Sequence, residues 1–227
     1  MGDYLMPAGI ISLISFVLIL VLTPLLFMEV MLIAFHKLGI SPIIGLFIVV
    51  GIFLGSLFNL PIKRYRFKRK LDSIQPLLFG TGFRFPRKII DETEVVIAVN
   101  VGGCIIPVLI VFYELIRLVY HGVYIAPLIA IFINIGACFT MSRSVKGVGV
   151  VIPAFLPGLL AAFCGLLLYP ENSPAVAFCA GVLGPVIGAD LLKLREFISA
   201  GSGLISIGGA GSFDGIVISG IVALLLS

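Results

Sequence analysis

The sequence GGAGSFDG, residues 208–215, interrupts the last hydrophobic segment of the chain, which runs from about residue 204 to residue 227. Asp214 therefore lies roughly halfway along a segment that is long enough to cross a membrane. A carboxylate at that depth costs about 2.5 kcal/mol or more on insertion scales, so it should face protein or water. A second acid, Asp190, ends the preceding apolar segment. We expect Asp190 and Asp214 to carry the activity, either as catalytic groups or as proton- or ion-binding groups.

The composition of the whole chain indicates an integral membrane protein. The chain is 60% hydrophobic and 11% charged, with a mean hydropathy of +1.26, whereas soluble domains carry about 25% charged residues. Its 227 residues predict one membrane domain, 1–227, with an all-α, polytopic transmembrane helical bundle as its fold. The cysteines lie inside apolar segments and are expected to be small buried side chains without disulfides; they are Cys104, Cys138, Cys164 and Cys179.

Seven apolar stretches approach the spanning length of about 20 residues. The last one or two are expected to be broken by glycine. The stretches are roughly 8–35, 40–60, 95–116, 124–141, 148–168, 175–193 and 203–227.

The distribution of basic residues predicts the orientation of these spans. Of the 15 Lys and Arg residues, all but Lys37 and Arg117 fall in the loops at 61–94, 142–147 and 193–202, which alternate with the other loops. Cytoplasmic loops carry an excess of Lys and Arg. We therefore expect a protein of the plasma membrane with a cytoplasmic N-terminus and an external C-terminus.

The loop at about 61–94 is the sizeable cytoplasmic segment. The basic run from Lys63 to Lys70 is expected to bind anionic lipid headgroups of the bilayer, at about 1 kcal/mol per basic residue. No nucleic acid is expected as a partner, because no recognition fold surrounds this run. At the end of the loop, Asp91 or Thr93 is expected to cap the third helix.

Glycine, proline and polar residues gather at a similar depth in the cytoplasmic halves of four predicted spans. Broken backbone is tolerated in a bilayer only where protein or water surrounds it, so we infer a central cavity open to the cytoplasm. Alternatively, glycine pairs such as Gly184 and Gly188 are close-packing motifs of membrane helices, which could also join copies into a homo-oligomer. The residues expected to line the cavity are Asn100, Gly102, Gly103, Pro153, Gly188, Gly208, Gly209, Gly211, Ser212 and Gly215.

The motifs GAD (188–190) and GGAGSFDG (208–215) resemble those of an uncharacterised family of prokaryotic multi-pass membrane proteins with a domain of unknown function. The resemblance covers most of the last five predicted spans and implies an architecture without an activity. A looser likeness is to presenilin-type intramembrane aspartyl proteases, which use two aspartates and a Pro-Ala-Leu motif. That likeness implies that Asp190 and Asp214 act as acid and base, and that the residues from Pro153 to Phe155 position the substrate.

Three functions remain open from the sequence. The first is a transporter or channel for a small solute or ion that uses Asp214 in the cavity; the second is an intramembrane aspartyl hydrolase, and the third is a membrane assembly factor without chemistry. No cofactor is expected, because the glycine-rich stretch 201–211 lacks dinucleotide-loop spacing. No metal is expected either. Asn134 is expected to hydrogen-bond a neighbouring helix, and Glu114 is expected to pair with Arg117.

Overall fold

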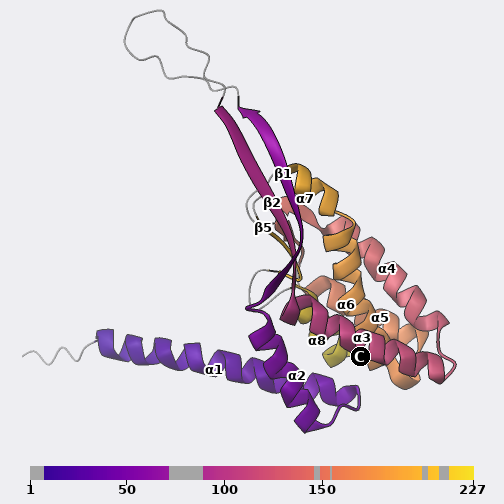
Figure 1. Ribbon diagram of the computed structural model, residues 1–227. Helices are drawn as coiled ribbons and strands as arrows, with labels where there is room; N and C mark the ends of the chain where they lie inside the picture. Colours follow the sequence, from indigo (N-terminus) through magenta and orange to yellow (C-terminus); the bar gives the residue numbers. More distant parts are fainter. Residues whose placement is uncertain (1–7, 72–88, 146–148, 154, 201–203, 210–214) are drawn as a thin grey trace, which may run out of the picture.

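The protein is described by a computed structural model over residues 8–71, 89–145, 149–153, 155–200, 204–209 and 215–227. Helices dominate the molecule, and a long β-hairpin extends from one end of the helical part (Figure 1). The α-helices are α1 (Ala8–Lys37), α2 (Pro42–Gly55), α3 (Ile106–Tyr120), α4 (Ile125–Met141), α5 (Phe155–Leu168), α6 (Ser173–Leu183), α7 (Leu194–Ala200) and α8 (Gly215–Leu226). Two π-helical segments, η1 (Val101–Ile105) and η3 (Gly184–Leu191), precede α3 and follow α6, and a 3₁₀ turn, η2, covers Pro170–Asn172.

Each of the seven predicted apolar stretches contains an apolar helix. Three continuous helical runs have the length and composition to cross a membrane: Ser12–Lys37, Val101–Tyr120 and Pro170–Glu196. The other apolar helices, α2, α4, α5 and α8, have 10–17 residues each, which is short of the roughly 20 residues that span a bilayer. A bundle of seven complete spans therefore stays a prediction.

Strands in the described part of the chain correct the all-α prediction. β1 (Asn59–Leu71) and β2 (Ile89–Asn100) form an antiparallel hairpin, and β5 (Leu204–Ile207) adds to β2 in parallel. A short ribbon joins β3 (Arg143–Val145) and β4 (Gly149–Val151). Residues 95–99 were predicted to begin a membrane span, but they form part of β2. Four of these five residues are β-branched, and such side chains favour a paired strand.

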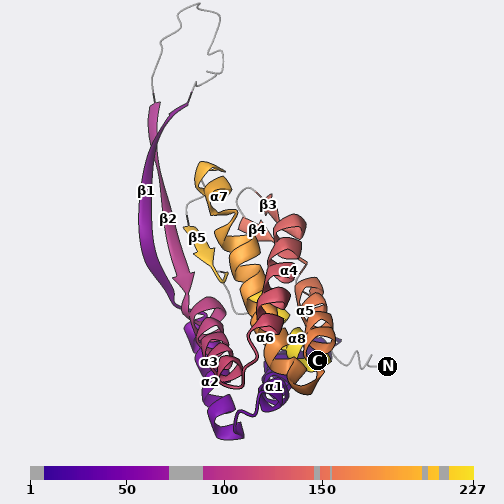
Figure 2. The same cartoon turned by 90° about the vertical axis from the view of Figure 1, so that its right-hand side faces the viewer.

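The hairpin stands away from the helices along most of its length, whereas β5 lies at its base (Figure 2). Two exposed ion pairs link the strands: Oε1 of Glu94 lies 3.9 Å from Nη1 of Arg64 and 4.0 Å from Nε of Arg66. The predicted basic loop thus begins as a strand. Asp91 and Thr93 lie within β2, so neither begins the third helix, and the predicted cap is wrong.

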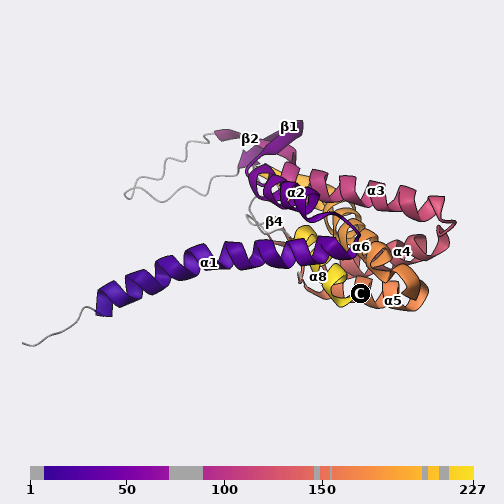
Figure 3. The same ribbon diagram turned by 90° about the horizontal axis from the view of Figure 1, so that it is seen from below.

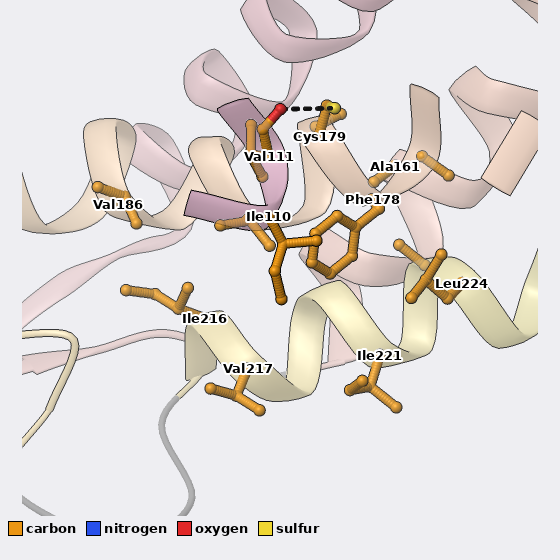
Figure 4. Close-up of a cluster of buried hydrophobic side chains, with 14 of the residues drawn as sticks. Ile110, Val111, Ala161, Phe178, Cys179, Val186, Ile216, Val217, Ile221 and Leu224 are labelled. Atoms are coloured by element: carbon orange, nitrogen blue, oxygen red, sulfur yellow. Dashed lines mark hydrogen bonds between the residues drawn. The ribbon is translucent and has the colours of Figure 1, made fainter. Parts of the chain in front are cut away.

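The core lies between the helices and is built from small and β-branched side chains. Figure 4 shows Phe178 of α6 among Ile110 of α3, Ala161 of α5 and the apolar face of α8. α5, α6 and α8 pack most extensively against one another, and small residues allow their backbones to approach closely. The four cysteines are buried, as predicted.

Among the residues that the structure describes, helix α1 packs against the other helices through its C-terminal part. Its earlier turns extend away from the other helices (Figure 3), and an 18-residue apolar window of its candidate span is 6% buried. Lys37 donates to the carbonyl of Leu225 at 2.8 Å, and Arg117 donates to the carbonyl of Leu38 at 2.7 Å. These two bonds fasten the end of α1 to α8 and α3.

Candidate functional site

The first half of the site is the junction between β2 and the π-helical segment η1. Asn100 is extended and caps η1, because its Oδ1 accepts from the backbone N–H of Gly103 at 2.7 Å. Its Nδ2 donates to the carbonyl of Ser56 at 2.7 Å and to Oδ1 of Asn59 at 3.2 Å. Asn100 has no exposed surface, so these bonds satisfy an amide that would otherwise be costly to bury. The Asn100 side chain therefore joins three elements by hydrogen bonds: the end of α2, the start of the hairpin and η1.

The second half of the site is the π-helical segment η3, which carries Asp190 near its end. Pro185, the second residue of η3, has no backbone N–H and cannot make an α-helical bond to the carbonyl of Gly181. The helix widens there, and such π segments occur frequently at functional sites. Asp190 is partly exposed, and its Oδ2 accepts from the backbone N–H of Gly208 at 3.0 Å.

Glycines let the two halves meet backbone against backbone. Gly208 has a φ of +83° and Gly209 a φ of +78°, which residues with a side chain rarely adopt. A Cβ on Gly103 would lie 2.1 Å from the carbonyl oxygen of Gly208, and a Cβ on Gly102 would lie 2.0 Å from that of Ile52. Glycine is required at positions 102 and 103 because the backbone of η1 lies against that of α2 and of the turn after β5.

A serine on β5 completes the junction. The Ser206 hydroxyl oxygen lies 2.6 Å from Oδ1 of Asn59 and 2.7 Å from the carbonyl oxygen of Gly209. The backbone N–H of Gly209 donates to the carbonyl of Ser206 at 3.3 Å, which closes a turn with Gly208 at its third position. Asn59, Asn100, Asp190, Ser206 and the turn therefore form one connected polar network, which we call the junction site.

The charged neighbour of Asp190 does not pair with it. Lys193 donates to the carbonyl of Ser142 and its Nζ lies 5.2 Å from the centroid of the Phe139 ring. Among the residues that the structure describes, no salt bridge includes Asp190. The Asp190 carboxylate is held instead by the backbone N–H of Gly208.

The structure brings together several of the residues singled out in the sequence. Asp190, Asn100, Gly103, Gly208 and Gly209 belong to the junction site, and Gly102 packs beside it.

Other residues singled out in the sequence lie apart from the junction site. Gly188 faces α4, where a Cβ would lie 2.4 Å from the carbonyl oxygen of Ile135. Pro153 is exposed, and Gly215 begins α8 beside Ile152.

Three singled-out residues, Gly211, Ser212 and Asp214, lie outside the described residues. The predicted cavity and the predicted Asp190–Asp214 pair therefore stay predictions.

Two members of the junction site, Asn59 and Ser206, are absent from the residues named above as expected to line the cavity. Asn59 and Ser206 lie near the ends of predicted apolar stretches, where polar residues are common. The signal that could have found them is a pair of hydrogen-bonding side chains next to predicted breaks in the membrane segments. Within the described ranges, no group of three or more His, Cys, Asp or Glu side chains could hold a metal ion.

Apolar helices of spanning length indicate a membrane protein. A family model matches residues 53–226, and the chain belongs to that family, which is described as "Protein of unknown function (DUF1614)". This confirms the expected membership of an uncharacterised family. Neither a curated protein nor a solved structure matches the chain.

Proposed function

We propose that the chain is a multi-pass plasma membrane protein that moves a small solute or an ion, with its N-terminus in the cytoplasm and its C-terminus outside. The observation that carries the proposal is the bond between the Asp190 carboxylate and the Gly208 amide, at 3.0 Å. Asp190 lies in the candidate span Pro170–Glu196, which has an 18-residue apolar window that is 72% buried inside the molecule. Ionisable side chains within membrane bundles mark ion paths and proton relays.

The interrupted backbone around Asp190 supports the same proposal. The last apolar stretch contains β5 and α8 as separate elements, with Gly208 and Gly209 in a turn after β5. In many transporters the substrate and coupling-ion sites are formed where membrane helices are broken, by freed carbonyls and helix ends. The α6–η3 segment, with its π-helical end at Asp190, is a second irregular element at the same junction.

In the proposed mechanism, the protonation state of Asp190 controls whether the turn at Gly208 is held. When the side chain is ionised, it accepts a charge-assisted hydrogen bond from Gly208, which is about twice as strong as a neutral one. A proton that arrives from water binds the carboxylate and makes it a weaker acceptor, so the turn at Gly208 is released. Loss of that proton to the other side restores the bond. A transported solute would be coupled to this cycle if it binds only one of the two arrangements.

Hydrolysis would require a different partner for Asp190. An aspartyl dyad needs a second carboxylate within about 3–5 Å, so that the pair shares a proton. In the described residues, the hydrogen-bond partner of the Asp190 carboxylate is a backbone amide. The hydrolase hypothesis depends on Asp214, which is outside those residues, and the assembly-factor hypothesis gives Asp190 no role.

The test compares Asp190→Asn with the wild type in proteoliposomes. A pH-sensitive dye inside the vesicles reports proton movement while a panel of amino acids, sugars and carboxylic acids is added in turn. We expect the wild type to move protons with at least one of these solutes and Asp190→Asn to move none. Glu171→Gln is the matched control, because Glu171 is an exposed acid at the other end of the same candidate span. Equal rates for Asp190→Asn and the wild type would overturn the proposal.

We also propose that the basic part of the hairpin contacts anionic lipid. Lys63, Arg64 and Arg66 are exposed on β1, and Glu94 offsets part of their charge. Replacing all three cations with Gln should weaken the retention of phosphatidylglycerol by the purified protein, measured by native mass spectrometry. Retention of zwitterionic lipid should not change. Equal phosphatidylglycerol retention by the variant would contradict a headgroup contact.

A further inference from the structure

One face of helix α1 carries most of the polar side chains of its candidate span. Positions that alternate in steps of three and four residues lie along one face of a helix. Four of the six polar or charged residues in the span Ser12–Lys37 belong to one such series, and every member of the series is exposed. We call this series the α1 seam; its members are Ser12, Ser15, Ile19, Leu22, Leu26, Glu29, Ile33 and His36.

The opposite face of α1 is the one that packs against the protein. Met31 and Phe35 are buried in the core, and the ring of Phe35 meets that of Phe178 on α6 edge-on, with centroids 6.2 Å apart. With 3.6 residues per turn, these two residues lie on the far side of the helix from the α1 seam. The α1 seam therefore faces away from the core of its own chain, and the earlier turns of α1 extend away from the other helices (Figure 3).

Glu29 is the charged member of the α1 seam that lies deepest in the span. It precedes Lys37 by about 12 Å along the helix axis, which is farther than its side chain reaches. Thr23 and Lys37, which lie off the seam, donate to the carbonyls of Ile19 and Leu225, each at 2.8 Å. In the described part of the chain, the Glu29 carboxylate has no hydrogen bond or salt bridge. Acidic side chains in membrane spans face protein or water and pair with other polar groups, so Glu29 needs a partner that these residues do not supply.

A second copy of α1 fits the pattern of the α1 seam. Apolar residues that repeat every 3.5 positions are typical of two helices that supercoil around each other, and a polar residue at one such position fixes their register. Two copies inserted in the same direction have parallel α1 helices, so each seam residue meets its own counterpart. Two carboxyl groups that meet cannot both ionise and share a proton. The two Glu29 side chains therefore satisfy each other by a hydrogen bond.

We propose that the α1 seam joins two copies of this chain as a parallel helix pair, with their Glu29 carboxyl groups hydrogen-bonded to each other. The second copy covers the polar side chains that α1 turns away from its own core. α1 precedes residues 53–226, which the family model matches, and it contributes no residue to the junction site. The pair therefore forms whether or not the chain moves a solute.

Cysteine crosslinking of the purified full chain in lipid vesicles tests the α1 seam. Leu26→Cys places a thiol on the seam, and Leu20→Cys places one on the opposite face; the two leucines are 65% and 61% exposed. The four native cysteines are buried, so the wild type measures the background. After oxidation with copper phenanthroline at a high lipid-to-protein ratio, Leu26→Cys should form about fivefold more disulfide-linked dimer than Leu20→Cys, because a disulfide needs Cα atoms within about 7 Å.

Substitutions of Glu29 test the carboxyl pair in the same vesicles. Energy transfer between donor-labelled and acceptor-labelled copies, followed as the lipid is diluted, gives the Kd of the pair. Glu29→Leu should raise this Kd by about 3–20-fold, as loss of one interhelical hydrogen bond would. Glu29→Gln should stay close to the wild type, because two amides can hydrogen-bond across the helices. Thr23→Ala is the matched control, since Thr23 is an exposed polar residue of α1 that lies off the seam, and its Kd should not change.

The outcomes separate this inference from the proposed function. The vesicles contain no other protein, so a wild type that stays monomeric would overturn the second copy as the partner of the α1 seam. Equal crosslinking of Leu26→Cys and Leu20→Cys would do the same. Equal Kd values for Glu29→Leu and Thr23→Ala would overturn the carboxyl pair. In each of these cases, proton movement that is lost in Asp190→Asn would still support the proposed function, and a negative transport assay would leave the α1 pair unaffected.

Discussion

The carboxylate of Asp190 and the backbone amide of Gly208 are joined by a 3.0 Å hydrogen bond, although the residues are 18 positions apart. The bond connects the end of the π-helical segment η3 to the turn that follows β5. A side chain that holds a glycine turn can release it without unfolding a helix, because glycine adopts several backbone conformations at little cost. The junction site therefore contains a part that is held by the buried Asn100 side chain and a turn that is held by the Asp190 carboxylate.

Removing the acceptor at Asp190 should destabilise the fold moderately. Asp190→Ala leaves the Gly208 N–H without its partner, and we expect the free energy of unfolding to fall by about 1–3 kcal/mol. Asp190→Asn keeps an acceptor oxygen but loses the charge, so its free energy of unfolding should fall by about half as much as that of Asp190→Ala. Thermal unfolding followed through the buried cysteines measures both. Equal stability of Asp190→Ala and the wild type would show that the bond contributes nothing.

The contact between Gly103 and Gly208 predicts an effect of similar size from a smaller change in the side chain. In Gly103→Ala the new Cβ would lie 2.1 Å from the carbonyl oxygen of Gly208, which is backbone and cannot rotate away. Overpacking of this kind costs about 1–3 kcal/mol. We expect a matching loss of Tm, and a loss of solute-coupled proton movement because the Gly208 turn is displaced.

Gly136→Ala is the control for that change. Gly136 lies in α4, is exposed, and would have nothing within 4 Å of an added Cβ. Alanine is a better helix former than glycine by about 0.8–1.0 kcal/mol, so Tm should rise or stay unchanged. If Gly103→Ala behaves like Gly136→Ala, the backbone contact at Gly208 is not part of the folded state.

The helices were predictable from hydropathy, whereas the hairpin was not. An apolar run such as residues 95–99 has the same mean hydropathy whether it begins a membrane helix or forms a strand. What decides between them is pairing with the strand at 59–71, and that strand is basic and was interpreted as a lipid-binding loop. Pairing between Asn59 and Asn100 joins positions 41 residues apart, which no local pattern reveals.

The candidate site was predictable in part, for a physical reason. Asp190, Asn100 and the glycines at 103, 208 and 209 were found because polar or flexible residues are costly inside apolar segments. Their hydrogen-bond partners were not. Asn59 and Ser206 look ordinary in the sequence, and their importance comes from geometry, since each lies within 3.3 Å of another oxygen or nitrogen of the site.

The effects of substituting Asn134 and Gly184 on the free energy of unfolding should be strongly non-additive. The Asn134 amide donates to the carbonyl of Ala180 at 2.7 Å, which confirms the predicted interhelical bond, and a Cβ on Gly184 would lie 2.5 Å from Nδ2 of Asn134. Each of Asn134→Ala and Gly184→Ala should destabilise the fold, by about 0.6–1.7 kcal/mol and 1–3 kcal/mol. In the double variant the space left by Asn134 accepts the new methyl group, so the two losses should not add.

A double-mutant cycle on thermal unfolding measures that coupling. Thr140→Ala serves as the control for Asn134→Ala, because the exposed Thr140 hydroxyl donates within its own helix, to the carbonyl of Ala137 at 2.9 Å. It should change Tm little and add to Gly184→Ala. Strict additivity of Asn134→Ala and Gly184→Ala would mean that the two side chains do not meet.

Glu114 and Arg117 form the predicted ion pair, and the two partners should respond unequally to substitution. Glu114 has no exposed surface, and both of its oxygens lie 3.3 Å from the same Arg117 nitrogen. Arg117→Met leaves a buried carboxylate without its cation, so we expect a loss of about 3–5 kcal/mol. Glu114→Gln leaves a cation that is about one-third exposed and can be hydrated, so its loss should be smaller.

Combining the two changes should restore much of the stability that Arg117→Met loses, because no buried charge remains unpaired. Recovery should be incomplete, since Arg117 also donates to the carbonyl of Leu38 at 2.7 Å and that bond fastens the end of α1 to α3. Thermal unfolding of the two single variants and of the double variant tests the order of stabilities. If Arg117→Met proves as stable as the double variant, Glu114 is protonated once Arg117 is absent and leaves no buried charge unpaired.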